Sequence, residues 1–202
     1  MAREMLQVTG VLLTGGESRR MGKNKALLEL DGKPLIERTL DILRKTCSEV
    51  VISSRSEDLY SSYGYQVIPD IFPGKGPLGG LYSVLQKASY EYLFLAACDM
   101  PFLDETSIRY IYSRMDDFDA IVPYALGRMH PLHAFYHKRI TPLVEEKIQK
   151  DQLRIVDVLS ECRMKILKSE DGEDFYKNRI DQSVVNVNTP DEWVTMLNKV
   201  KN

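Results

Sequence analysis

The chain has 202 residues, of which 44% are hydrophobic and 28% are charged, the proportions of an ordinary soluble globular protein. Its net charge of −2 creates no overall field that favours nucleic acid or an anionic membrane surface, so neither is an expected partner. The cysteines are odd in number and widely spaced, and neither a signal peptide nor a long uncharged apolar run is visible, which favours a cytoplasmic location.

Short apolar runs alternate with amphipathic stretches along the first 123 residues. Strands are predicted at residues 7–13, 50–53, 65–68, 92–97 and 120–123. Helices are predicted at residues 35–45, 78–87 and 105–115, with Pro34 suited to the first helical turn. The strands are continuous apolar runs such as "YLFLAA", which is typical of parallel strands covered on both faces. The pattern predicts an α/β fold with a doubly wound, mostly parallel sheet flanked by helices.

The alternation ends after residue 123. The segment "HPLHAFYH" (130–137) has the character of an aromatic-rich strand, 141–150 that of a helix, and 164–167 that of another strand. Near the C-terminus, Thr189 or Asn188 can cap a final helix in which Pro190 fits the first turn. No linker or internal repeat divides the chain, which is therefore expected to form one domain, residues 1–202.

The first predicted strand leads into a glycine-rich basic loop within "VLLTGGESRRMGKNKALLEL" (11–30). The loop is not a P-loop, because five residues separate Gly16 from Gly22 and Asn24 follows Lys23; it also lacks the G-x-G-x-x-G dinucleotide pattern. Its cations suit a polyphosphate, and they are Arg19, Arg20, Lys23 and Lys25. The alternative is a flexible glycine turn with solvated basic residues.

Ligands bind beyond the carboxyl ends of the strands in an open parallel sheet. This rule selects Thr14, Gly15, Gly16, Ser53, Ser54, Asp70 and Asp99. Asp99 directly follows a buried run, where it can bind Mg²⁺, an ion that takes few protein carboxylates and completes its shell with phosphate and water; it can instead stabilise a turn. Together, the basic loop and this carboxylate indicate phosphoryl or nucleotidyl transfer from a nucleoside triphosphate.

Two other features of the sequence are weaker indications of function. The glycines of "DIFPGKGPLGGLYSVL" (70–85) either contact a ligand or only relieve crowding. A zinc site at His130, His133 and His137 is disfavoured, because Pro131 opposes a helix and a strand would point His130 away from the other two. Pocket lining or ordinary packing is favoured for these histidines, and a structural role for the cysteines.

The segment L-T-G-G-x-S-R-R-M-G-x-x-K at residues 13–25 resembles the signature loop of the GT-A-like nucleotidyltransferases. Within that superfamily it resembles the molybdenum cofactor guanylyltransferase (MobA) family. Other similar segments are "DGKPLIERTLDIL", "VIPD", "GPLGGLYSVL", "CDMPFL", "HPLHAFY" and "VNVNTPDEW", so the resemblance covers residues 11–193. The chain departs from the family pattern at Asn24, where an aspartate usually precedes the lysine, and at Ser53, where some members have an asparagine.

The resemblance implies a GT-A-like fold and an enzyme that transfers GMP from Mg-GTP to the terminal phosphate of molybdopterin. The products would be molybdopterin guanine dinucleotide and pyrophosphate. Residues 1–123 would form a nucleotide-binding half and residues 124–202 an acceptor-binding half. Further implied partners are other cofactor-biosynthesis proteins and apo-molybdoenzymes.

The resemblance also implies roles for individual residues. The nucleotide-binding positions would be Leu13, Thr14, Gly15, Gly16, Lys25, Ser53, Asp70 and Asp99. The catalytic residues would be Arg19, Lys25 and Asp99, with Asp99 as the magnesium ligand, and the acceptor-binding residues would be Asn186 and Asn188. Because the acceptor phosphate is already an anionic nucleophile, the reaction needs alignment and charge neutralisation more than a strong general base.

Two alternatives stay open. A related nucleotidyltransferase could use CTP on molybdopterin or a sugar phosphate acceptor, although "HPLHAFY" and "VNVNTP" speak against a sugar phosphate. A non-catalytic doubly wound binding module, such as a receiver domain, is the alternative of another class. Receiver domains place an acidic pair after the first strand, whereas this chain has Thr14-Gly15-Gly16.

Overall fold

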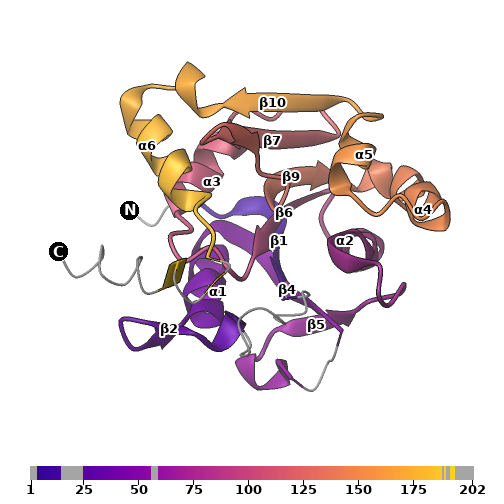
Figure 1. Ribbon diagram of the computed structural model, residues 1–202, viewed down its shortest axis with the longest axis horizontal. Coiled ribbons are helices and arrows are strands. Elements are labelled where there is room, and N and C mark those ends of the chain that lie inside the picture. The colour runs from indigo at the N-terminus through magenta and orange to yellow at the C-terminus, as the bar shows by residue number, and fades with distance from the viewer. Residues whose placement is uncertain (1–3, 15–24, 56–58, 188, 190–191, 194–202) are drawn as a thin grey trace.

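The computed structural model describes residues 4–14, 25–55, 59–187, 189 and 192–193. Its centre is an eight-stranded sheet with the strand order β10-β7-β9-β6-β1-β4-β5, in which β8 also pairs with β7 (Figure 1). The strands of this sheet are β1 (Leu6–Leu13), β4 (Cys47–Ser54), β5 (Gln66–Pro69), β6 (Tyr92–Ala97), β7 (Ala120–Ala125), β8 (Arg128–Met129), β9 (His133–His137) and β10 (Met164–Lys168). A separate small hairpin joins β2 (Glu29–Leu30) and β3 (Lys33–Pro34).

The large sheet is mixed but mostly parallel. Strand β1 pairs in parallel with β4 and β6, β4 with β5, and β10 with β7. Strand β9 is antiparallel to both β6 and β7, so β6 and β7 point the same way, and β8 is antiparallel to β7. The carboxyl ends of β5, β4, β1, β6 and β7 therefore lie at one edge of the sheet. The predicted doubly wound, mostly parallel sheet is confirmed.

Helices cover both faces of the sheet. They are α1 (Leu35–Thr46), α2 (Gly76–Lys87), α3 (Glu105–Tyr112), α4 (Thr141–Gln149), α5 (Ile155–Leu159) and α6 (Asp174–Ser183). Short 3-10 helices also occur at η1 (Lys25–Leu27), η2 (Ser61–Tyr63), η3 (Lys138–Ile140) and η4 (Ser169–Asp171). Figure 1 shows α2, α4 and α5 on one face and α1, α3 and α6 on the other.

The central strand β1 is buried on both faces. Val11 and Leu13 belong to the core on the α2 side, whereas Val8 and Leu12 belong to the core on the α1 side. Because both faces are covered, the strand is a continuous apolar run, and burial of each large aliphatic side chain contributes about 1.5–3 kcal/mol. On the α1 side Gly10 is required, since a Cβ there would lie 2.9 Å from Cys47 Sγ.

Several predicted elements differ at their ends. Helix α3 stops at Tyr112 rather than residue 115, because the N–H groups of Arg114 and Met115 turn back to Ile111 and Tyr112. Helix α2 starts two residues before the predicted position, at Gly76, since Pro77 fits a first turn.

Two prolines lie outside the helix and the strand in which the sequence placed them. Pro34 has extended backbone (ψ 143°) and precedes α1 instead of lying in its first turn. The aromatic-rich strand begins at His133 rather than residue 130, because a turn through Pro131 is closed by the His133 N–H on the His130 carbonyl (3.0 Å).

The elements β2, β3, β8, α5 and α6 were not predicted. Only Ile180 and Ser183 are buried in α6, so its sequence carries little apolar periodicity. At the predicted final helix, the Thr189 hydroxyl accepts the Glu192 N–H (3.2 Å), as a capping residue does; Asn188 and Pro190 lie outside the described residues. Within the described part of the chain, no helix combines the length and hydropathy needed to cross a bilayer.

Candidate active site

The predicted nucleotide residues follow a single row across the sheet. The strand register places Leu13 beside Ser53 of β4 and beside Ala97 of β6, and Ser53 beside Ile68 of β5. Strand β4 ends at Ser54, and Thr14, Asp70 and Asp99 follow the ends of β1, β5 and β6. The edge is the carboxyl edge of parallel strands, the place where α/β sheets bind ligands.

Thr14 is hydrogen-bonded to the neighbouring strand β4. Its backbone N–H and its hydroxyl both donate to the Ser53 carbonyl oxygen, at 3.0 and 2.9 Å. On the other side of β1, the Cys98 N–H donates to the Leu13 carbonyl (3.2 Å). These bonds hold Leu13 and Thr14 in a fixed position relative to β4 and β6.

Three of the predicted nucleotide residues converge on Gly80 of α2. A Cβ at Gly80 would lie 2.6 Å from Leu13 Cδ1, 2.8 Å from Ser53 Oγ and 3.7 Å from Asp70 Oδ1. Any larger residue would therefore displace Leu13 and the Ser53 hydroxyl. The missing side chain of Gly80 allows α2 to lie directly against the ends of β1, β4 and β5.

The Ser53 hydroxyl is buried and makes no hydrogen bond within the described structure. Buried polar groups are normally satisfied, because leaving one unpaired costs about 1–3 kcal/mol. A ligand that brings a donor or an acceptor to this position would remove that cost. Sequence reasoning selected Ser53 from its place at the strand end and gave no sign that its hydroxyl would be unpaired.

Asp70 is a half-buried carboxyl group at the end of β5. Burial raises its pKa, and the Arg55 charge offsets that rise only in part. The next residue is tied to α2, since the Ile71 N–H donates to Ser83 Oγ (2.8 Å) and Ser83 Oγ donates to the Gly79 carbonyl (2.8 Å). Asp70 is thus a positioned acceptor whose charged form would gain from a hydrogen-bond donor on a ligand.

Asp99 is half-buried and lies two residues beyond the end of β6. Its carbonyl oxygen accepts the Val187 N–H at 3.0 Å. Within the described residues, no group of three or more His, Cys, Asp or Glu side chains could hold a metal ion. An aspartate carboxylate just beyond a strand end suits Mg²⁺, which takes one or two protein carboxylates and completes its shell with water and substrate phosphates.

The predicted acceptor residue Asn186 lies beside the Asp99 segment, because its neighbour Val187 makes the bond to Asp99. Its side-chain oxygen accepts a hydrogen bond from Arg128 Nη2 at 2.9 Å. Arg128 belongs to the β7–β8 hairpin at the same edge of the sheet and was not predicted from the sequence. An exposed arginine in a hairpin carries no sequence signal that would distinguish it.

Other predicted residues cannot be placed in this way. Gly15, Gly16, Arg19 and Asn188 lie outside the described residues. Lys25 begins the 3-10 helix η1 at the far end of the loop. The described part of the site thus brings together Leu13, Thr14, Ser53, Asp70, Asp99 and Asn186.

The three histidines have separate surroundings. His133 is fully buried, packs edge-on against Phe94 (5.1 Å between ring centroids), and has Nε2 3.3 Å from Ser183 Oγ. Burial, with a contribution from His130, lowers the pKa of His133 to about 3. His130 has Nε2 2.9 Å from the Ala125 carbonyl, and His137 packs edge-on against Tyr92. These are packing contacts inside and at the end of the sheet.

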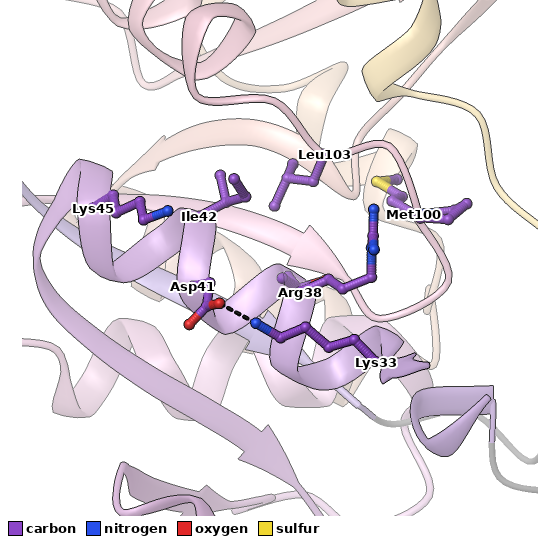
Figure 2. Close-up of a pocket in the computed structure, with 9 residues that line it drawn as sticks. Lys33, Arg38, Asp41, Ile42, Lys45, Met100 and Leu103 are labelled. Atoms are coloured by element: carbon purple, nitrogen blue, oxygen red, sulfur yellow. Dashed lines mark hydrogen bonds and ion pairs between the residues drawn. The ribbon is translucent and has the colours of Figure 1, made fainter. Parts of the chain in front are cut away.

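A pocket of about 200 Å³ lies between α1 and the segment that follows Asp99 (Figure 2). It is lined by Lys33, Arg38, Thr39, Asp41, Ile42, Lys45, Met100, Pro101 and Leu103. Lys33 forms an ion pair with Asp41, and this hydrogen bond is the main reason that the pKa of Asp41 is lowered. Among the described residues, no predicted nucleotide residue lines this pocket, although Met100 and Pro101 of its lining directly follow Asp99.

Comparison with known proteins identifies a family that this chain resembles over most of its length. Residues 10–163 match the model of the MobA-like NTP transferase domain. A probable molybdenum cofactor guanylyltransferase from Pelotomaculum thermopropionicum is 35% identical over 94% of this chain and 92% of its own length. Another from Carboxydothermus hydrogenoformans is 33% identical over 96% of both chains.

A solved structure is also similar over almost the whole chain. It is molybdopterin-guanine dinucleotide biosynthesis protein A from Archaeoglobus fulgidus, with a TM-score of 0.82 and 26% identity. The similarity covers 96% of this chain and 98% of the other.

Proposed function

The chain belongs to the family of MobA-like NTP transferase domains, and we propose that it is a molybdenum cofactor guanylyltransferase. It transfers GMP from GTP to the terminal phosphate of molybdopterin and releases pyrophosphate. The observation that carries this assignment is the 33–35% identity to proteins of that name over more than nine-tenths of both chains. The meeting of Asp99 with the Asn186 segment supports it, because a transferase must bring donor and acceptor to one place.

The reaction exchanges one phosphorus–oxygen bond for another. An oxygen of the molybdopterin phosphate attacks the α-phosphorus of GTP, and the bond from that phosphorus to the β-phosphate breaks as pyrophosphate leaves. The acceptor oxygen is already anionic at neutral pH, so the protein has no need of a strong general base. Its work is to align two anions that repel each other and to offset their charge.

We assign the nucleotide to the wall formed by β1, β4, β5 and α2. Leu13 and Ser53 would contact it beside Gly80, and Asp70 would accept a hydrogen bond from it. Arg19 and Lys25 would neutralise its phosphates from the basic loop. This division gives residues 1–123 the nucleotide and residues 124–202 the acceptor.

Asp99 would hold Mg²⁺, which, when bound, offsets the charge of the triphosphate and of the leaving pyrophosphate. The half-buried carboxylate beyond the end of β6 fits this role, because Mg²⁺ needs only one or two protein carboxylates beside the substrate phosphates. The implied partners are GTP and molybdopterin, with other cofactor-biosynthesis proteins and apo-molybdoenzymes downstream.

The decisive experiment is a nucleotide panel. Purified protein is incubated with Mg²⁺, molybdopterin and GTP, CTP, ATP or UTP in turn, and both pyrophosphate and the dinucleotide are measured. We expect strong preference for GTP and no dinucleotide when molybdopterin is omitted. Equal or faster turnover with CTP would overturn the guanylyltransferase assignment, and no product with any nucleotide would overturn transferase activity on molybdopterin.

A further inference from the structure

Arg128 stands at the carboxyl edge of the sheet, on the same edge as Asp99. It follows the tight turn of the β7–β8 hairpin, in which Leu126 and Gly127 both have positive φ (51° and 78°). The turn is held by the Tyr124 hydroxyl, which donates to the Gly127 carbonyl at 3.0 Å. The Arg128 side chain is exposed and donates from Nη2 to Asn186 Oδ1 at 2.9 Å.

Backbone hydrogen bonds hold the residues on both sides of Asn186. The N–H of Val185 donates to the Gln182 carbonyl at the end of α6 (3.1 Å), and the N–H of Val187 donates to the Asp99 carbonyl (3.0 Å). Asn186 therefore lies one residue from a direct backbone contact with Asp99. A group that Arg128 and Asn186 bind together would lie next to the Asp99 segment.

The chemistry of this pair suits an anion. Arginine has only donors, so Asn186 must turn its carbonyl oxygen toward Arg128 and keep its two amide protons for another partner. Arg128 retains further N–H donors of its own. The ion pairs between described residues do not include Arg128. The pair thus presents hydrogen-bond donors and one positive charge beside the Asp99 segment.

We propose that Arg128 binds the phosphate of the acceptor directly and, at the same time, orients Asn186 to donate to that phosphate. The inference rests on the proposed function, which places an anionic phosphate nucleophile beside Asp99. A guanidinium group can serve both partners because its planar fork supplies several N–H donors. Its charge also offsets the repulsion between the acceptor phosphate and the triphosphate.

The test compares Arg128→Ala, Arg128→Lys and Asn186→Ala with the wild type. For each, KM and kcat are measured for molybdopterin and for GTP, and molybdopterin binding is measured directly by titration calorimetry. We expect Arg128→Ala to weaken molybdopterin binding about ten- to a hundredfold, the range for lost hydrogen bonds to a charged group, with KM for GTP within about twofold. Arg128→Lys should be intermediate, since lysine keeps the charge and loses the fork.

The matched control is Arg154→Ala, which removes another exposed arginine just before α5 and should leave both KM values unchanged. Unchanged molybdopterin binding in Arg128→Ala, or an equal rise in both KM values, would overturn the inference. So would an Arg128→Ala effect that vanishes in an Asn186→Ala background, because Arg128 would then act only through Asn186. If the wild type neither binds molybdopterin nor uses it, the proposed function is wrong as well; if it does both, only the role of Arg128 is at stake.

Discussion

The backbone N–H of Val187 donates a 3.0 Å hydrogen bond to the carbonyl oxygen of Asp99. This bond joins the C-terminal segment to the turn that follows β6, at the carboxyl edge of the sheet. Asn186 and Asp99 are thereby placed on one surface, although they come from the two halves of the chain. The proposed transfer depends on this junction, because GTP and its acceptor must meet there.

Replacing Ser53 by alanine should weaken nucleotide binding without lowering the stability of the protein. The Ser53 hydroxyl is buried and has no partner in the described structure, so its removal should leave the free energy of unfolding unchanged or raise it by up to about 1 kcal/mol. If the hydroxyl contacts the nucleotide, KM for GTP should rise about three- to tenfold. Urea unfolding and steady-state kinetics measure the two effects.

The control for this variant is Ser83→Ala. Ser83 is equally buried, but its hydroxyl accepts from the Ile71 N–H and donates to the Gly79 carbonyl. Its removal leaves a backbone donor unpaired and should lower stability by about 1–3 kcal/mol. A Ser53→Ala protein that is destabilised as much as Ser83→Ala, with normal KM for GTP, would contradict a ligand role for Ser53.

Gly80→Ala should damage the nucleotide site. The new Cβ would meet Leu13 Cδ1 at 2.6 Å and Ser53 Oγ at 2.8 Å, so both side chains or α2 itself must move. Overpacking of this kind typically costs about 1–3 kcal/mol of stability. We also expect KM for GTP to rise at least tenfold, measured at a temperature where the variant stays folded.

Gly79→Ala is the comparison for Gly80→Ala. Its Cβ would lie 2.9 Å from the Phe72 carbonyl oxygen, so it should be destabilising too, but it does not point at Leu13 or Ser53. The expected difference between the two variants is therefore in KM for GTP. Equal KM values in two equally stable variants would show that the contacts of Gly80 serve packing alone.

Much of the site could be predicted because it follows from the sheet. Parallel strands with aligned ends place the residues after β1, β4, β5 and β6 on one edge, and short apolar runs in the sequence located these strands. Thr14, Ser53, Ser54, Asp70 and Asp99 were among the residues selected by that rule, whereas Leu13 was implied by the family resemblance. Their roles in binding and catalysis stay predictions.

What the sequence did not reveal depends on contacts between distant segments. The approach of Gly80 to Leu13 is set by how α2 packs on the sheet, and the bond from Arg128 to Asn186 joins an exposed hairpin to a segment after α6. The bond from Arg128 leaves no local pattern, and the glycines of residues 70–85 indicated either ligand contact or relief of crowding without showing which residues they approach. Helix α6 itself has too few buried side chains to show helical periodicity.

The buried imidazole of His133 should make stability depend on pH. Its pKa is about 3 in the folded protein because of burial, against an ordinary value of about 6.5 in the unfolded chain. Between these values the unfolded chain binds the extra proton, so the free energy of unfolding falls as the pH falls through that window and is fully retained above about pH 6.5. From pH 7.5 to pH 5 the loss from this residue should be about 2 kcal/mol.

The measurement is urea unfolding of the wild type and of His133→Gln at both pH values. Glutamine can still bond to Ser183 but does not titrate, so the variant should lose about 2 kcal/mol less than the wild type over this interval, whatever its absolute stability. The other acidic and histidine groups contribute equally to both proteins. Identical pH dependence would mean that His133 is not held neutral.

Asp99→Asn is the sharpest test of the proposed metal site. Asparagine keeps the shape and hydrogen-bonding capacity of aspartate but removes the negative charge that Mg²⁺ requires. The backbone bond from Val187 to the Asp99 carbonyl is unaffected by the change, so the melting temperature should stay close to that of the wild type.

Transfer of GMP, in contrast, should fall about a hundredfold or more in Asp99→Asn, equivalent to about 3 kcal/mol of transition-state stabilisation. The Mg²⁺ concentration needed for half-maximal activity should rise as well. Both are measured beside thermal unfolding, with Asp104→Asn as the control. Asp104 caps α3 by accepting the Ser107 N–H, and asparagine caps about as well, so this control should change neither the stability by much nor the dependence on Mg²⁺. Near-normal transfer in Asp99→Asn would rule out the metal role, and a collapse of its melting temperature would assign Asp99 to the structure of the turn.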